Sequence, residues 1–164
     1  MRHHTVVLGL VASLYSPEPA ASQASSASLT VSANVVKNCT ISTTPINFGS
    51  YDPVEANATR ALDGLGTIVV TCTQGTSGHI GLSQGSNAVG SVRRMEDGSQ
   101  YLVYEIYKDP GRTQPWGNGF SDNLDVPGAP NLDPRTITAY GRVPAGQDVR
   151  VGQYLDVVIA TVNF

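Results

Sequence analysis

Two alternating segments, one near each end of the chain, constrain the fold most. In the first, residues 28–39, every second side chain is apolar: Leu29, Val31, Ala33 and Val35. In the second, residues 154–164, the same alternation runs to the last residue: Val158, Ala160, Val162 and Phe164. A period of two is the pattern of a β-strand with one buried face. Both ends of the chain are therefore predicted to join a sheet, and the first segment must find its partner either in its own domain or in another molecule.

Between these ends the sequence is typical of short strands separated by turns. Extended segments are predicted at residues 46–53, 65–72, 78–85, 101–107 and 135–143, and residues 108–134 are predicted to form a long surface connection. The 17 Gly and 10 Pro residues punctuate the segments, while β-branched residues fill them. This pattern, without any helical period, indicates an all-β fold, a β-sandwich of the immunoglobulin type rather than a barrel.

The first 24 residues predict a secretory signal peptide. Arg2 supplies the positive start, residues 5–15 form an apolar run, and Ser22-Gln23-Ala24 is a small-residue cleavage site. The run is about half the length required to span a bilayer, which disfavours a membrane anchor. The remaining chain is long enough for one domain. A net charge of −3 provides no excess of basic residues that would attract phosphate groups, so no nucleic-acid partner is expected.

Cys39 and Cys72 are predicted to form one disulfide. Export implies an oxidising compartment, where an even number of cysteines points to a bridge. A metal site or a reactive thiol is the alternative, and both require partner groups. His79 is the only histidine after the signal peptide, and the two cysteines are far apart in sequence. We therefore expect no metal and no cofactor.

Two motifs that suggest chemistry are weak. The stretch "GLSQG" matches G-x-S-x-G, yet no helical period follows it and the only candidate base, His79, lies just upstream of Ser83. We therefore expect no enzymatic activity. A calcium site in the long connection would use Asp122, Asp125 and Asp133, whose spacing does not follow the EF-hand order.

Two further features can each be interpreted as structural or as part of a binding site. Trp116, between Pro115 and Gly117, is predicted to plug the opening of the sandwich; the alternative is a sugar-stacking platform shared with tyrosines. Arg93 and Arg94 are predicted to lie on a solvated strand edge rather than to form a binding patch.

Several stretches in combination resemble the spore coat protein U domain family, which includes Csu-type pilin subunits of archaic chaperone-usher pili. They are "VKNCTISTTPINFGSYDP", "IVVTCTQG", "VRRM", "YEIYKDPGRTQPWGNG" and "YGRVPAGQDVRVGQYLDVVIATVNF". The resemblance covers about residues 29–164. It divides the chain into a signal peptide (1–24), an N-terminal donor-strand segment (25–37) and a spore coat protein U or pilin domain (38–164).

The resemblance implies an incomplete immunoglobulin-like β-sandwich, completed by a donor strand from a neighbouring subunit. The apolar side chains of residues 29–35 would then be the donor face, and those of residues 158–164 one wall of the acceptor groove. The implied partners are neighbouring pilin subunits in a homopolymer, a periplasmic chaperone and an outer-membrane usher. The implied destination is a cell-surface pilus that acts in adhesion and biofilm formation. A secreted coat protein and a closed carbohydrate-binding β-sandwich remain alternatives.

Overall fold

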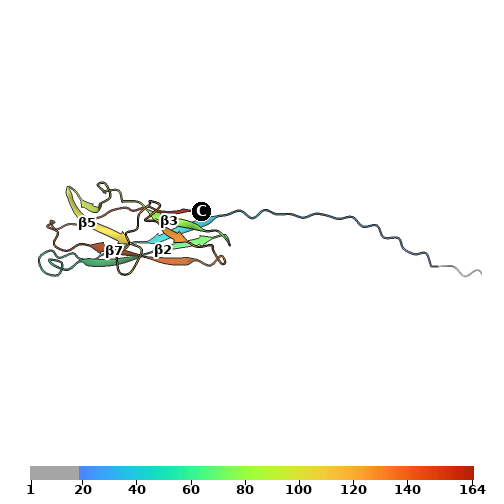
Figure 1. Cartoon of the computed structure of the whole chain (residues 1–164), viewed down its shortest axis with the longest axis horizontal. Helices are drawn as coiled ribbons and strands as arrows, with labels where there is room; N and C mark the ends of the chain where they lie inside the picture. Colours follow the sequence, from blue (N-terminus) through green and yellow to red (C-terminus); the bar gives the residue numbers. More distant parts are fainter. Residues whose placement is uncertain (1–18) are drawn as a thin grey trace, which may run out of the picture. The chain divides into compact units, whose positions relative to one another are not determined.

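The computed structural model describes residues 19–164, and residues 35–164 of these form an all-β domain (Figure 1). Its strands are β1 (Cys39–Thr44), β2 (Leu62–Cys72), β3 (Gly78–Leu82), β4 (Arg93–Asp97), β5 (Gln100–Tyr107), β6 (Leu124–Val126), β7 (Arg135–Val143) and β8 (Ala160–Asn163). No helix within residues 19–164 has the length and hydropathy needed to cross a bilayer.

The strands form two antiparallel sheets. The larger has the order β1-β2-β7-β5-β4, and the smaller has the order β6-β3-β8. The centre of the larger sheet is the long β2–β7 ladder, which runs from Leu62 opposite Val143 to Val70 opposite Arg135. β1 pairs only with β2, and β8 pairs only with β3. Each sheet therefore ends on an unpaired edge.

The core lies between the inner faces of the two sheets. In β2 the side chains of Ile68, Val70 and Cys72 are buried while their neighbours are less so, as the period of two predicts. Trp116 is fully buried, and its Nε1 donates a hydrogen bond to the carbonyl oxygen of Ile80 at 2.8 Å. The plug interpretation of Trp116 is therefore confirmed, and its ring offers no face to a sugar.

The predicted disulfide joins Cys39 to Cys72. The two residues lie opposite each other in the β1–β2 ladder, and the main-chain N–H of Thr73 donates to the carbonyl oxygen of Asn38. The bond fixes the beginning of β1 to the end of β2.

The N-terminal alternating segment forms no strand in this single chain. Leu29 is 88% exposed and Val31 is 86% exposed, and residues 19–38 carry no regular secondary structure. A strand needs a hydrogen-bonding partner along its edge, so a strand formed by this segment with another molecule stays a prediction. Residues 1–18 of the predicted signal peptide lie outside the described residues.

Candidate functional site

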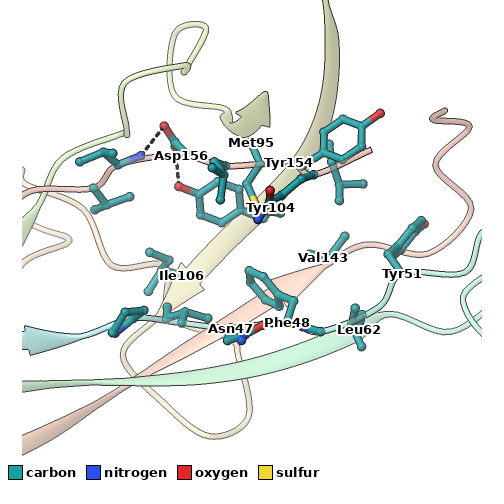
Figure 2. A pocket seen from close by; sticks show the side chains of 18 of the residues that line it. Asn47, Phe48, Tyr51, Leu62, Met95, Tyr104, Ile106, Val143, Tyr154 and Asp156 are labelled. Carbon is teal, nitrogen blue, oxygen red and sulfur yellow. Dashed lines mark hydrogen bonds between the residues drawn. The ribbon is translucent and has the colours of Figure 1, made fainter. Parts of the chain in front are cut away.

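An open groove lies between the unpaired edges of the two sheets. It has a volume of about 1060 Å³. It is lined by residues 43–53, which include the end of β1, and by residues 149–158 together with Ala160, the first residue of β8. Figure 2 shows Phe48 and Tyr51 on one side and Tyr154 and Asp156 on the other. Its floor consists of core side chains from the strands: Leu62, Ile68, Leu82, Met95, Leu102, Tyr104, Ile106, Ala139 and Val143. The groove therefore gives access to the core of the sandwich.

Residues 45–51 form the first lip of the groove. Ile46 and Phe48 pack against the core over glycines of β2 and β7. A Cβ atom on Gly66 would lie 2.7 Å from Cγ1 of Ile46, and one on Gly141 would lie 2.7 Å from Cζ of Phe48. These distances are too short for a real side chain, so the glycines create the recess that seats this lip.

The main chain of the first lip is unpaired. In the described part of the chain, residues 45–51 make no hydrogen bond to another main-chain group. One contact is local: the N–H of Gly49 donates to Oδ1 of Asn47 at 2.9 Å. The remaining donors and acceptors of this lip are available to a further strand.

Residues 154–163 form the second lip. Its even-numbered side chains are half-buried, whereas the odd-numbered Leu155, Val157 and Ile159 are 63%, 65% and 64% exposed. The predicted alternation of this segment is therefore present, with the even-numbered residues facing inward.

The main-chain hydrogen bonds of the second lip all lie on one side. Ser83 N–H donates to the carbonyl oxygen of Ile159 at 2.9 Å, and Ser86 N–H to that of Val157 at 3.1 Å. In an antiparallel strand successive residues bond to opposite sides, so the even-numbered residues present their N–H and C=O groups to the groove. Among residues 19–164, Asp156 and Val158 have no main-chain partner.

The predicted wall residues divide into two groups. Val158 and Ala160 line the groove. Val162 packs on the core but does not line the groove. Phe164 is 51% exposed and borders a separate recess beside His79.

The groove extends instead toward the N-terminal part of the second lip. Tyr154 and Asp156 line it there. Sequence reasoning missed Asp156, because a carboxylate interrupts the apolar alternation; the only signal was its even-numbered position.

Asp156 is held by several hydrogen bonds at the inner face of the second lip. Its Oδ2 accepts from the Tyr104 hydroxyl at 2.6 Å, and its Oδ1 accepts from the N–H groups of Asn87 at 3.1 Å and Val157 at 2.9 Å. Burial, followed by this carboxylate, raises the pKa of Tyr104 far above its usual range, so the hydroxyl remains a donor. Gly85 makes room, since a Cβ there would lie 2.0 Å from Oδ2.

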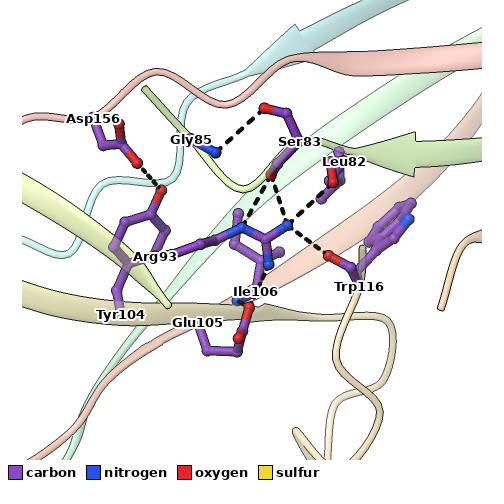
Figure 3. A network of polar contacts seen from close by, with 9 residues as sticks. All are labelled: Leu82, Ser83, Gly85, Arg93, Tyr104, Glu105, Ile106, Trp116 and Asp156. Carbon is purple, nitrogen blue, oxygen red and sulfur yellow. Dashed lines mark hydrogen bonds and ion pairs between the residues drawn. The ribbon is translucent and has the colours of Figure 1, made fainter. Parts of the chain in front are cut away.

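Arg93 corrects the prediction of a solvated strand edge, because its side chain is only 1% exposed. Figure 3 shows its guanidinium in a network of polar contacts with Glu105, Ser83 and Trp116. Arg93 is ion-paired with Glu105, and its guanidinium donates to the carbonyl oxygens of Leu82, Ser83 and Trp116. The planar fork of arginine suits several acceptors at once. The network fixes the end of β3 and the loop at Trp116.

Ser83 has a structural role in the same region. Its Oγ accepts a hydrogen bond from the N–H of Ile159 at 2.9 Å, which ties the second lip to the end of β3. His79 lies four residues earlier along an extended chain, which corresponds to about 13 Å. The two side chains are therefore too far apart for a direct hydrogen bond.

The three loop aspartates do not come together. Asp125 lies 3.9 Å from His79, and Asp133 accepts a hydrogen bond from Asn131 at 2.6 Å. Residues 19–164 contain no cluster of three or more His, Cys, Asp or Glu side chains suited to a metal ion.

The fold and the groove together define a class of protein, an immunoglobulin-like β-sandwich that is incomplete by one strand. The chain belongs to the Spore Coat Protein U domain family, whose sequence model matches residues 25–161. It is 37% identical over 167 residues to Protein U of Myxococcus xanthus, covering 93% of this chain and 92% of that protein.

A solved structure shares the fold. It is a chain of the crystal structure of the CsuC–CsuE chaperone–tip adhesion subunit pre-assembly complex from archaic chaperone-usher Csu pili of Acinetobacter baumannii. The TM-score is 0.56 at 21% sequence identity, and the match covers 79% of the present chain. The present chain spans 40% of that longer chain.

Proposed function

We propose that this chain is a structural pilin subunit that polymerises by donor-strand complementation into a chaperone-usher pilus. One observation carries the proposal: an open groove over the core with unpaired main-chain groups along both lips. Such a groove accepts an extended strand, which adds hydrogen bonds on both sides and side chains into the core. The proposed occupant is segment 25–37 of a neighbouring copy, whose apolar face is exposed in the single chain.

The topology favours one direction for the incoming strand. The start of β1 at Cys39 and the end of β8 at Asn163 lie at the same end of the domain, because β2 leads into β3 there through a short turn (Figure 1). A donor antiparallel to β8 leaves the groove at the opposite end, where the next domain has room. A parallel donor would place two domains at one end, which hinders linear growth.

The expected strength of the joint follows from burial. Leu29, Val31 and Val35 are more than 80% exposed in the single chain, and full burial of each such side chain contributes about 1.5 to 3 kcal/mol. The new ladder of main-chain hydrogen bonds adds to this. Because separation would expose the whole strand and the groove together, the polymer should dissociate very slowly.

An open groove also requires cover before assembly, because exposed edges and apolar surface promote aggregation. We propose that a periplasmic chaperone covers the groove after export with signal peptide 1–24, and that an outer-membrane usher catalyses the exchange. The solved Csu complex, which pairs a chaperone with a tip adhesion subunit, supports a chaperone partner. The proposed destination is a surface pilus that acts in adhesion and biofilm formation, without an enzymatic role.

A secreted coat protein is the second candidate. The identity of 37% to Protein U, together with the family's description, favours it. Immunogold electron microscopy of producing cells separates the two: thin filaments support the pilus, and a continuous layer supports the coat.

The pilus proposal is tested by aspartate substitutions along the donor segment. Val31→Asp and Val35→Asp should abolish filaments, because each places an unpaired charge in an apolar groove at a cost of several kcal/mol. Thr30→Asp and Ser32→Asp are matched controls on the opposite face of the strand. Filament yield per cell, with subunit abundance measured by immunoblot, is the readout.

The test depends on the difference in filament yield between aspartate on the inward face and aspartate on the opposite face of the strand. If all four variants are tolerated equally and still give filaments, the segment is only a linker, and donor-strand complementation would then be rejected.

A further inference from the structure

The alternation of the donor segment fixes its inward face but not its register, because a slip of two residues keeps the same face inward. We propose that Asp156 sets the register by selecting Ala33 of the incoming segment as its lateral neighbour. This inference rests on the proposed function above and names the contact that makes the joint specific.

The extent of the groove supports this pairing. Four inward-facing residues of the second lip line it: Tyr154, Asp156, Val158 and Ala160. On the same face of the donor segment, Ala27 precedes four further apolar side chains: Leu29, Val31, Ala33 and Val35. When the antiparallel strand places Ala33 beside Asp156, each of these four side chains lies beside one of the four lining residues.

A slip in either direction disturbs the match. Moving the donor by two residues one way places Leu29 beside Val162, which is outside the groove lining, and Val35 beside Asp156. Moving it the other way places Val31 beside Asp156 and Val35 beside Gly152, which lines the groove but is exposed and has no side chain to pack against the valine.

Size complementarity supports the same register. Leu29, the largest of the four donor side chains, lies beside Ala160, the smallest of the four residues on the second lip. Ala33, the smallest of the four donor side chains, lies beside Asp156. Alternation of large and small side chains across facing positions allows close packing without strain.

Asp156 is suited to act as a fixed marker because it cannot easily move away. Three hydrogen bonds hold its carboxylate, and the recess at Gly85 leaves no space for a larger neighbour there. A branched valine at the adjacent donor position would crowd the carboxylate and remove water from its remaining acceptor site, whereas alanine adds only a methyl group.

The hydrogen-bond pattern makes the register measurable. Since Asp156 presents its main-chain groups to the groove, Asp156 and Ala33 would form a hydrogen-bonded pair. Ser32 and Val157 would then form the adjacent non-hydrogen-bonded pair, whose Cα atoms are about 4.5 Å apart. That separation is within the disulfide range of roughly 4.4 to 6.8 Å.

The experiment combines Ser32→Cys in turn with Leu155→Cys, Val157→Cys or Ile159→Cys in the full chain, expressed with its chaperone and usher. The three acceptor positions have nearly equal exposure, between 63% and 65%, so their reactivities are matched. Filaments assembled under reducing conditions are then oxidised, boiled and separated on non-reducing gels, where cross-linked subunits form a ladder.

The S32C/V157C variant should give a ladder at least about tenfold stronger than either neighbour, which corresponds to about 1.4 kcal/mol. A maximum at Leu155→Cys or Ile159→Cys would overturn the register and leave the proposed function intact. Filaments without a ladder in any variant would overturn both.

A second set of variants tests whether Asp156 is the cause. Exchanging the two donor residues, V31A with A33V, moves the small side chain by two positions, so the ladder maximum should move from Val157→Cys to Leu155→Cys. A maximum that stays at Val157→Cys after the exchange would show that another contact sets the register, and the proposal would be rejected.

Discussion

Replacing Arg93 by methionine tests the buried network most directly. The substitution keeps an unbranched apolar stem and removes the guanidinium with its charge and its donors. Three carbonyl oxygens, those of Leu82, Ser83 and Trp116, lose a partner, and Glu105 loses its ion pair. Arg93 is buried, whereas the Glu105 side chain is 28% exposed; loss of the ion pair together with the unsatisfied carbonyl oxygens costs about 3 to 5 kcal/mol.

This loss is large compared with the total stability of the domain. A domain of this size has a free energy of unfolding of about 5 to 15 kcal/mol. The lost hydrogen bonds share one guanidinium, so their individual values of about 1 to 3 kcal/mol are not additive. We therefore expect a decrease of about 3 to 5 kcal/mol in the free energy of unfolding.

The assay needs a monomer with a filled groove. Moving residues 25–37 to a position after Phe164, through a short flexible linker, should provide one, because the intramolecular donor has an effective concentration of about millimolar. Its urea unfolding can be followed by the fluorescence of Trp116, the only tryptophan of the chain.

A neighbouring arginine provides the matched control. Arg94 is partly exposed, and its Cζ lies 3.8 Å from the centre of the Tyr101 ring. Arg94→Met should therefore lower the free energy of unfolding by about 1 kcal/mol or less. The double variant R93M/E105Q should be less destabilised than the sum of its single variants, because no buried charge remains unpaired. Equal stability losses for R93M and R94M would refute the reasoning.

Three further predictions concern the disulfide, an ion pair and a glycine. Mass spectrometry of the exported protein should show one bridge between Cys39 and Cys72, and reduction should lower stability by about 3 to 4 kcal/mol; two free thiols would contradict this. Arg142 donates to both carboxylate oxygens of Asp63 and lowers its pKa below 3.8, so the pair stabilises the fold above this pH and is lost on acidification. Thermal unfolding between about pH 2 and 7 should therefore show weaker acid sensitivity in Asp63→Asn, and an unchanged pH profile would contradict it. Gly66→Ala should reduce filament yield, since its Cβ would lie 2.9 Å from a main-chain oxygen of β1; a normal yield would show that the first lip can shift.

The sequence predicted those parts of the fold that depend on local pattern. The β-branched run before Cys72 became β2, one strand of the long β2–β7 ladder, and the alternation before Phe164 became the second lip. β6 was missed, because three residues within a loop-rich stretch give no detectable period.

The burial of Arg93 was also beyond the sequence. An arginine pair followed by polar residues is usually solvated. Its burial depends on acceptors from Ser83 and Trp116, which lie 10 and 23 positions away, so no local pattern contains the information.

The extent of the groove was also only partly predicted from the sequence. Apolar alternation placed the wall at residues 158–164, whereas the groove follows the lip back to Tyr154 and includes a carboxylate. Asp156 is tolerated at an inward position only because Tyr104, from another strand, supplies a hydrogen-bond donor. A pattern within one strand identifies which face is inward, but the chemistry allowed on that face depends on what lies opposite.

The N-terminal segment provides the strongest argument that the missing information belongs to another molecule. Its alternation is as regular as that of any strand in the domain, yet Leu29 and Val31 remain almost fully exposed in the single chain. Natural sequences are normally consistent between local pattern and overall structure, and a violation marks a functional site. Here the violation is paired with its complement, because the same chain has a groove that lacks one strand. Under the proposed function, this segment, which has the pattern of a strand, fills the groove of another copy, and the presence of both features in one chain favours a polymer over a self-contained domain.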